Sequence, residues 1–238
     1  METIQYNILK PQFDSDIYTK IAEIPEVETS VKNLNRVLSY EPEENKKVFV
    51  FVDVLKCCVF LYTSNKVNED DLNNSIVTQH IFESHNKLLE YLNKINAQEK
   101  ENKESWTSDL KNRIKETKLL IESRKPSKIK ELTKGETTIN LNSILHTSWG
   151  YDQTNIEMFR IVKFLGKNYF IIQEIGQEQI KGSGGFMCCN VKAGKQDLNK
   201  LPIKAFVSDE GYMSICERGY KRSLYIDEGE THYKSWYA

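Results

Sequence analysis

Hydrophobic positions follow two different spacings along this 238-residue chain, and the spacing changes near Lys134. Before that point, long segments carry apolar residues three or four positions apart, the period of a helix with one buried face. After it, short segments rich in Ile, Val, Phe and Tyr alternate with glycine or polar turns, as strands do. We therefore predict an α+β protein, with a mixed N-terminal domain of long helices and a short sheet over residues 1–134 and a β-rich domain over 135–238.

Three segments of the N-terminal domain are predicted to be helical. Residues 27–40 form the first, and the second covers 76–95 behind the acidic residues 69–71, since negative charge favours a helix N-terminus. The third covers 106–121 and stops before Pro126. The last two helices could form a hairpin or one long bent helix.

Residues 47–63, K-V-F-V-F-V-D-V-L-K-C-C-V-F-L-Y-T, are rich in β-branched and aromatic side chains and predict one or two strands. Their near-continuous apolarity indicates that both faces are covered, as in the centre of a sheet. Asp53 is the one residue whose burial would be unexpected.

Seven short strands are predicted in the C-terminal domain. They cover residues 142–149, 157–165, 169–174, 186–191, 203–208, 212–217 and 223–226. Gly166, Lys167 and Asn168 suit a tight turn between the second and third. This many short strands in about a hundred residues predicts a small β-barrel or rolled sheet.

Composition and charge narrow the class of protein. The hydrophobic fraction of 39% and charged fraction of 28% are ordinary for a globular protein. The longest apolar stretch is broken by Asp53 and Lys56, and the N-terminus lacks the features of a secretory signal, so we expect a cytoplasmic protein with no membrane partner. Reduced thiols are expected for the five cysteines, Cys57, Cys58, Cys188, Cys189 and Cys216.

Residues 146–155, H-T-S-W-G-Y-D-Q-T-N, hold the densest group of candidate binding side chains. Two aromatic rings for stacking flank a glycine, and donors and acceptors follow them. Such a group could hold a base, a sugar or a peptide. The alternative is a structural corner whose polar groups cap the backbone. The candidate binding residues are Trp149, Tyr151, Asp152, Gln153 and Asn155.

The string S-W-G-Y-D-Q-T-N, followed by I-E-M-F-R-I-V-K-F-L-G-K, resembles a small domain of phage, plasmid and other mobile-element proteins. The resemblance covers roughly residue 137 to the end, and this chain has Phe159 where the family pattern leads us to expect tyrosine. The family has no established activity. What the resemblance implies is a β-rich fold and a mobile-element origin.

Two further segments combine features of nucleic-acid binding. Residues 94–134 carry an excess of positive charge, which suits phosphates if it is not simply a solvated face; Lys125, Lys128 and Lys130 are the candidates there. In residues 217–238, basic residues alternate with aromatic residues, a composition that binds single-stranded nucleic acid through backbone charge and base stacking. The alternative is that the aromatic side chains only close the barrel. The candidates in this segment are Arg218, Lys221 and Arg222.

No catalytic or metal-binding signature is evident. The glycine-rich loop at 181–185 precedes a predicted strand, whereas a phosphate-binding loop precedes a helix, so a flexible hairpin is expected. The four histidines are scattered, and we expect no metal and no cofactor.

The leading hypothesis is a non-enzymatic phage or mobile-element protein that binds RNA or a host-defence nucleoprotein complex, as an anti-CRISPR inhibitor does. One alternative is a small hydrolase or nuclease-like enzyme whose site includes His146 and Asp152. Another is a structural protein without a nucleic-acid partner.

Overall fold

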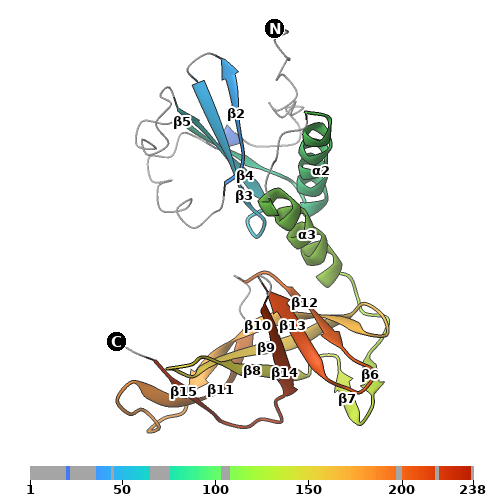
Figure 1. The fold of residues 1–238 in the computed structure, drawn as a ribbon, viewed down its shortest axis with the longest axis vertical. Helices are drawn as coiled ribbons and strands as arrows, with labels where there is room; N and C mark the ends of the chain where they lie inside the picture. Colours follow the sequence, from blue (N-terminus) through green and yellow to red (C-terminus); the bar gives the residue numbers. More distant parts are fainter. Residues whose placement is uncertain are drawn as a thin grey trace. The chain divides into compact units, whose positions relative to one another are not determined.

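A computed structural model describes residues 20–21, 36–43, 46–64, 76–102, 108–196, 200–217 and 220–236. The chain forms two compact units, residues 1–121 and 122–238 (Figure 1). The boundary expected near Lys134 falls instead inside a hairpin of the second unit, formed by β6 (Glu131–Lys134) and β7 (Thr137–Asn140). Leu132 and Ile139 of this hairpin pack into the core of the second unit, which explains the difference.

The first unit contains an antiparallel sheet of five strands in the order β1-β5-β4-β3-β2. The strands are β1 (Lys20–Ile21), β2 (Arg36–Glu43), β3 (Lys46–Asp53), β4 (Cys58–Ser64) and β5 (Ile76–Ile81). The central position expected for residues 47–63 is confirmed, because β3 and β4 form the middle of the sheet and Val50, Val52 and Val59 are buried. Asp53 accepts a hydrogen bond from the Lys56 backbone N–H at 3.0 Å, so its carboxylate holds the turn between these strands.

Two predictions for this unit were wrong. Residues 36–40 belong to β2 rather than to a helix, since pairing with β3 overrides a short helical spacing; residues 27–35 lie outside the described part. Residues 76–81 form β5, and the helix begins only at His85. The β-branched run I-V-T favours a strand, and Ser84 marks the helix start, where its Oγ lies 3.4 Å from the Lys87 backbone N–H.

Helices α2 (His85–Asn102) and α3 (Ser108–Ser123) confirm the other helical predictions where the structure describes them. On α2 the buried residues Leu88, Leu92 and Ile95 recur at helical spacing, as do Leu110 and Ile114 on α3. Neither of these described helices has the length and apolarity needed to cross a membrane.

Six antiparallel strands of the second unit close into a barrel. They are β8 (Ile144–Trp149), β9 (Asn155–Phe164), β10 (Tyr169–Gln179), β12 (Ile203–Val207), β13 (Met213–Glu217) and β14 (Tyr220–Ile226). Each strand pairs with the next in this order, including β10 with β12, and the pairing of β14 with β8 closes the ring. Inward-facing side chains such as Phe159, Phe170 and Ile215 fill its interior. The small β-barrel predicted from the sequence is confirmed.

Strands β11 (Cys188–Gln196) and β15 (His232–Ser235) extend the sheet beyond the barrel. The long strand β10 pairs first with β12 and then, from Ile175 onward, with β11, and this second pairing has a register shift at Gly176. A second apolar cluster, including Met158, Ile175 and Val191, joins this extension to β9 and β10. In Figure 1, β11 and β15 lie on the side of the unit opposite the β6–β7 hairpin.

Candidate functional site

The turn between β8 and β9 holds most of the S-W-G-Y-D-Q-T-N string and is tied down by β15. The Thr154 backbone N–H donates to Ser235 Oγ at 2.9 Å, and the Ser235 N–H donates to the Thr154 carbonyl at 3.0 Å. Gly150 has φ +126°, and a Cβ there would lie 1.9 Å from the Gln153 carbonyl oxygen. Glycine is therefore required by the geometry of the turn.

Trp149 and Arg222, both predicted to bind a partner, contact each other and share one carboxylate. Trp149 Nε1 donates to Glu157 Oε1 at 3.1 Å, and Arg222 Nη1 lies 2.7 Å from Glu157 Oε2. The Arg222 guanidinium is 5.7 Å from the centre of the Trp149 ring, within cation–π range. This arrangement joins β8, β9 and β14.

The remaining candidates of the turn divide into two groups. Gln153 and Asn155 face each other, with Gln153 Nε2 donating to Asn155 Oδ1 at 3.3 Å. Asp152 is exposed, and Tyr151 is fully exposed at the tip of the turn. Among the five residues named there, Tyr151 and Asp152 are exposed at the tip of the turn, and the ring of Trp149 is 45% exposed although its Nε1 is bonded to Glu157.

The basic candidates near α3 are also dispersed. Lys125 forms an ion pair of 2.8 Å with Glu122, which receives a second cation, Lys163, at 2.5 Å. Side-chain hydrogen bonds from Lys125, and then from Lys163, lower the pKa of Glu122 to about 2. Lys128 and Lys130 are exposed. Arg218 lies outside the described residues.

An open hollow of about 370 Å³ lies on the outer surface of the barrel, across β10, β12, β13 and β14. Among the predicted residues that the structure describes, Lys221 alone contributes to it. Tyr169 pairs across the sheet with Phe206, and Phe206 pairs with Ser214, so these outward-facing side chains form one row. The lining residues are Tyr169, Lys204, Ala205, Phe206, Ser214, Cys216 and Lys221.

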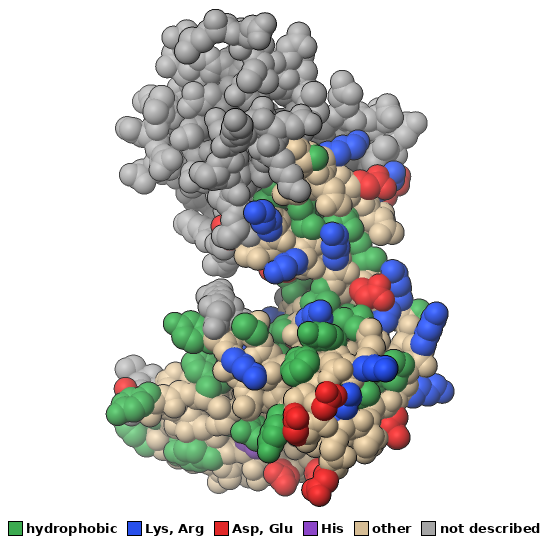
Figure 2. Space-filling view, turned by 45° about the vertical axis from the view of Figure 1, so that its right-hand side comes forward, with side chains coloured by type: hydrophobic (Ala, Val, Ile, Leu, Met, Phe, Trp, Pro, Cys, Tyr) green, Lys and Arg blue, Asp and Glu red, His purple; other side chains and the backbone are tan. Residues whose placement is uncertain are grey.

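Aromatic and cationic groups adjoin one another in this hollow. Lys204 Nζ lies 4.0 Å from the centre of the Tyr169 ring, and the rings of Tyr169 and Phe206 are 5.3 Å apart. No aspartate or glutamate is among these described lining residues. On the face of the barrel unit shown in Figure 2, apolar and basic side chains lie next to one another while acidic ones gather toward the lower edge.

Sequence reasoning missed Tyr169, Lys204 and Phe206. Tyr169 lies on β10, whereas Lys204 and Phe206 lie on β12, and no local motif joins the two strands. The sequence does place an aromatic or basic residue at an outward-facing position of each strand. These positions can be grouped into one surface only when it is known that β12 pairs with β10.

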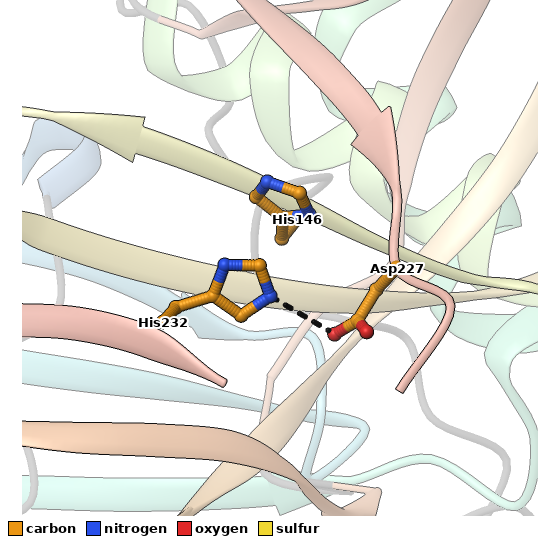
Figure 3. A group of neighbouring side chains, drawn as sticks. All are labelled: His146, Asp227 and His232. Carbon is orange, nitrogen blue, oxygen red and sulfur yellow. Dashed lines mark ion pairs between the residues drawn. The ribbon is translucent and has the colours of Figure 1, made fainter. Parts of the chain in front are cut away.

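His146 faces two residues that sequence reasoning did not connect with it. Its ring centre is 4.1 Å from that of His232, and His232 Nε2 lies 3.4 Å from Asp227 Oδ2 (Figure 3). Burial, and then the charge that His232 can carry, lowers the pKa of His146. The exposed Asp152 is not part of this group, which gives no support to a hydrolytic site built from His146 and Asp152.

Comparisons of this chain with family models, curated proteins and solved structures found no match.

Proposed function

We propose that the barrel unit binds single-stranded RNA at the hollow across β10, β12, β13 and β14. The observation that carries this proposal is the grouping of Tyr169, Lys204 and Lys221 around one open depression without a carboxylate in its described lining. An aromatic face and two ammonium groups are what a base and its neighbouring phosphates require.

The volume of the hollow and the side chains around it suit a nucleotide of single-stranded RNA. Its volume of about 370 Å³ is near the small end of ligand pockets, roughly 300–1,000 Å³, which suits one nucleotide of a longer strand. Tyr169 is 45% exposed and can stack with a base. Lys204 lies over the same ring, so it would meet the phosphate of the stacked nucleotide.

The resemblance to a mobile-element domain supplies the first RNA to try. The guide RNA of a host-defence nucleoprotein complex is single-stranded, and an inhibitor could bind it. In this proposal the protein acts by binding and the barrel carries out no reaction.

Fluorescence anisotropy with a labelled single-stranded RNA tests the proposal. The Lys204→Glu and Lys221→Glu double variant should bind at least about tenfold more weakly at 0.1 M salt, because two phosphate-facing cations become anions, and wild-type affinity should fall steeply with salt. The matched control is the Lys128→Glu and Lys130→Glu double variant, which has the same charge change outside the hollow.

Equal weakening by both double variants would mean that net charge, rather than this hollow, governs binding. No measurable binding by the wild-type chain at low salt would overturn the proposal, as would affinity that does not change with salt.

A further inference from the structure

His146, Asp227 and His232 come from three different parts of the barrel unit and meet at one point. His146 is on β8, Asp227 follows β14 directly, and His232 begins β15. One ligand-type atom of each residue lies within 4.8 Å of the other two. Figure 3 shows the two imidazoles and the carboxylate turned toward a common space.

The polar atoms of this cluster are buried without hydrogen-bond partners. His146 Nδ1, Asp227 Oδ2 and His232 Nε2 each have almost no solvent contact and no hydrogen bond in the described structure. The Asp227 side chain is 1% exposed and that of His232 is 10% exposed. Asp227 Oδ2 and His232 Nε2 face each other at 3.4 Å without forming a hydrogen bond, and His146 Nδ1 has no hydrogen-bond partner in the described structure. Poorly satisfied buried polar atoms are costly, so this grouping indicates a ligand that supplies a stronger interaction.

The carboxylate is oriented toward the histidines by its own loop. Asp227 Oδ1 accepts hydrogen bonds from the backbone N–H groups of Gly229 at 2.7 Å and Glu230 at 3.1 Å. Those bonds leave Oδ2 directed at His232. Metal-binding carboxylates are commonly fixed in this way, with one oxygen held and the other available.

The spacing and charge of these groups suit a cation. Ligand atoms about 2.0–2.2 Å from a tetrahedral zinc ion are about 3.3–3.6 Å apart, a range that includes the 3.4 Å between His232 Nε2 and Asp227 Oδ2. Asp227 and Glu230 add negative charge around the two histidines.

We propose that His146, Asp227 and His232 bind a divalent transition-metal ion through two imidazole nitrogens and one carboxylate oxygen, with Zn²⁺ as the first candidate. Two histidines and a carboxylate form a donor set that zinc and its neighbours prefer over magnesium or calcium. Three protein ligands leave room for water at a further position.

The bound ion would connect the barrel with its extension. Strand β15 also holds the β8–β9 turn through the hydrogen bonds between Ser235 and Thr154. An ion bound to His232 would therefore stabilise this attachment of β15 as well. This role is independent of RNA binding at the hollow.

Metal titration of the chelator-treated full chain tests the proposal. Zn²⁺ should bind with a dissociation constant below about 10 μM at neutral pH and raise the thermal unfolding midpoint by several degrees. Co²⁺ in its place should give the visible absorption of a four- or five-coordinate ion. Asp227→Asn should weaken Zn²⁺ binding at least about tenfold while keeping the size of the side chain.

The exposed thiol of Cys216 provides the control, because Cys216→Ser should leave the affinity unchanged. Should Asp227→Asn fail to fold, imidazole ¹⁵N spectra of the wild-type chain decide: Zn²⁺ should shift the signals of His146 and His232 and leave those of His80 and His85. Binding weaker than the stated limit, loss of binding in Cys216→Ser, or a shift confined to His80 and His85 would overturn the proposal.

Discussion

The β8–β9 turn and the hollow on β10 to β14 are both rich in aromatic and polar side chains, but they use them differently. In the turn, Trp149 donates to Glu157 and Thr154 is bonded to Ser235, so these polar groups are bonded within the unit. In the hollow, Lys204 lies over an exposed tyrosine, and the described lining contains no acidic group. Density of functional groups along the sequence is therefore a weaker guide to a binding surface than the availability of those groups after folding.

The same contrast separates lysines on different strands of the barrel. Lys163 on β9 is buried and bonded to Glu122, whereas Lys204 and Lys221 are exposed at the hollow. A lysine bonded inside the unit contributes to folding. An exposed lysine beside an aromatic ring can contribute to binding.

The largest effect is expected from Gly150→Ala, which tests the structural reading of the turn. The added Cβ meets the Gln153 carbonyl, and φ +126° is a glycine conformation, so we expect the unfolding free energy to fall by roughly 2–4 kcal/mol. Gly182→Ala is the matched control, because a Cβ there meets nothing within 4 Å; its φ of +80° should cost about 1 kcal/mol. Equal losses in urea denaturation would contradict this reading.

A smaller effect is expected from the pair of Glu122 and Lys163. Glu122→Ala leaves the buried Lys163 ammonium with the backbone carbonyl of residue 122, at 3.0 Å, and should lower the unfolding free energy by about 1–3 kcal/mol. Lys163→Met removes the buried charge itself and should stay within about 1 kcal/mol of wild type. The opposite order of the two losses would show that Lys163 is not held by this carboxylate.

The smallest effect is expected in how the unfolding free energy depends on pH in the acid range. Because Lys125 and then Lys163 lower the pKa of Glu122 from 4.5 to about 2, its ionised form contributes stability above pH 4.5 that is lost as the pH falls toward 2. The difference in unfolding free energy between wild type and Glu122→Gln should therefore shrink between about pH 5 and pH 3. A difference that stays constant over that range would exclude this linkage.

Much of the barrel was predictable because its strands alternate apolar and polar positions or carry continuous apolar runs. All seven strands predicted there were found. Strand β15, H-Y-K-S, was missed because Tyr233 is the one strand-favouring residue among its four; pairing with β11 makes it a strand. Strand β5 was assigned to a helix because its apolar residues also fit a helical spacing.

The candidate sites depended more heavily on tertiary structure. The string 146–155 attracted attention through its composition, yet its residue His146 contacts Asp227 and His232, which are distant in the sequence. Only the pairing of β14 with β8 and the return of β15 bring these three residues together. Similarly, Tyr169 and Lys204 meet because β12 closes the barrel against β10.

The most direct test of the central claim compares two tyrosines, one in each region, by the affinity of their alanine variants for single-stranded RNA. Removing the ring at the hollow, Tyr169→Ala, should weaken binding at least about fivefold, since stacking on an aromatic contributes roughly 1–3 kcal/mol per base. Tyr151→Ala, at the fully exposed tip of the turn, should change the affinity by less than about twofold. A loss confined to Tyr151→Ala would contradict the account and assign RNA binding to the β8–β9 turn.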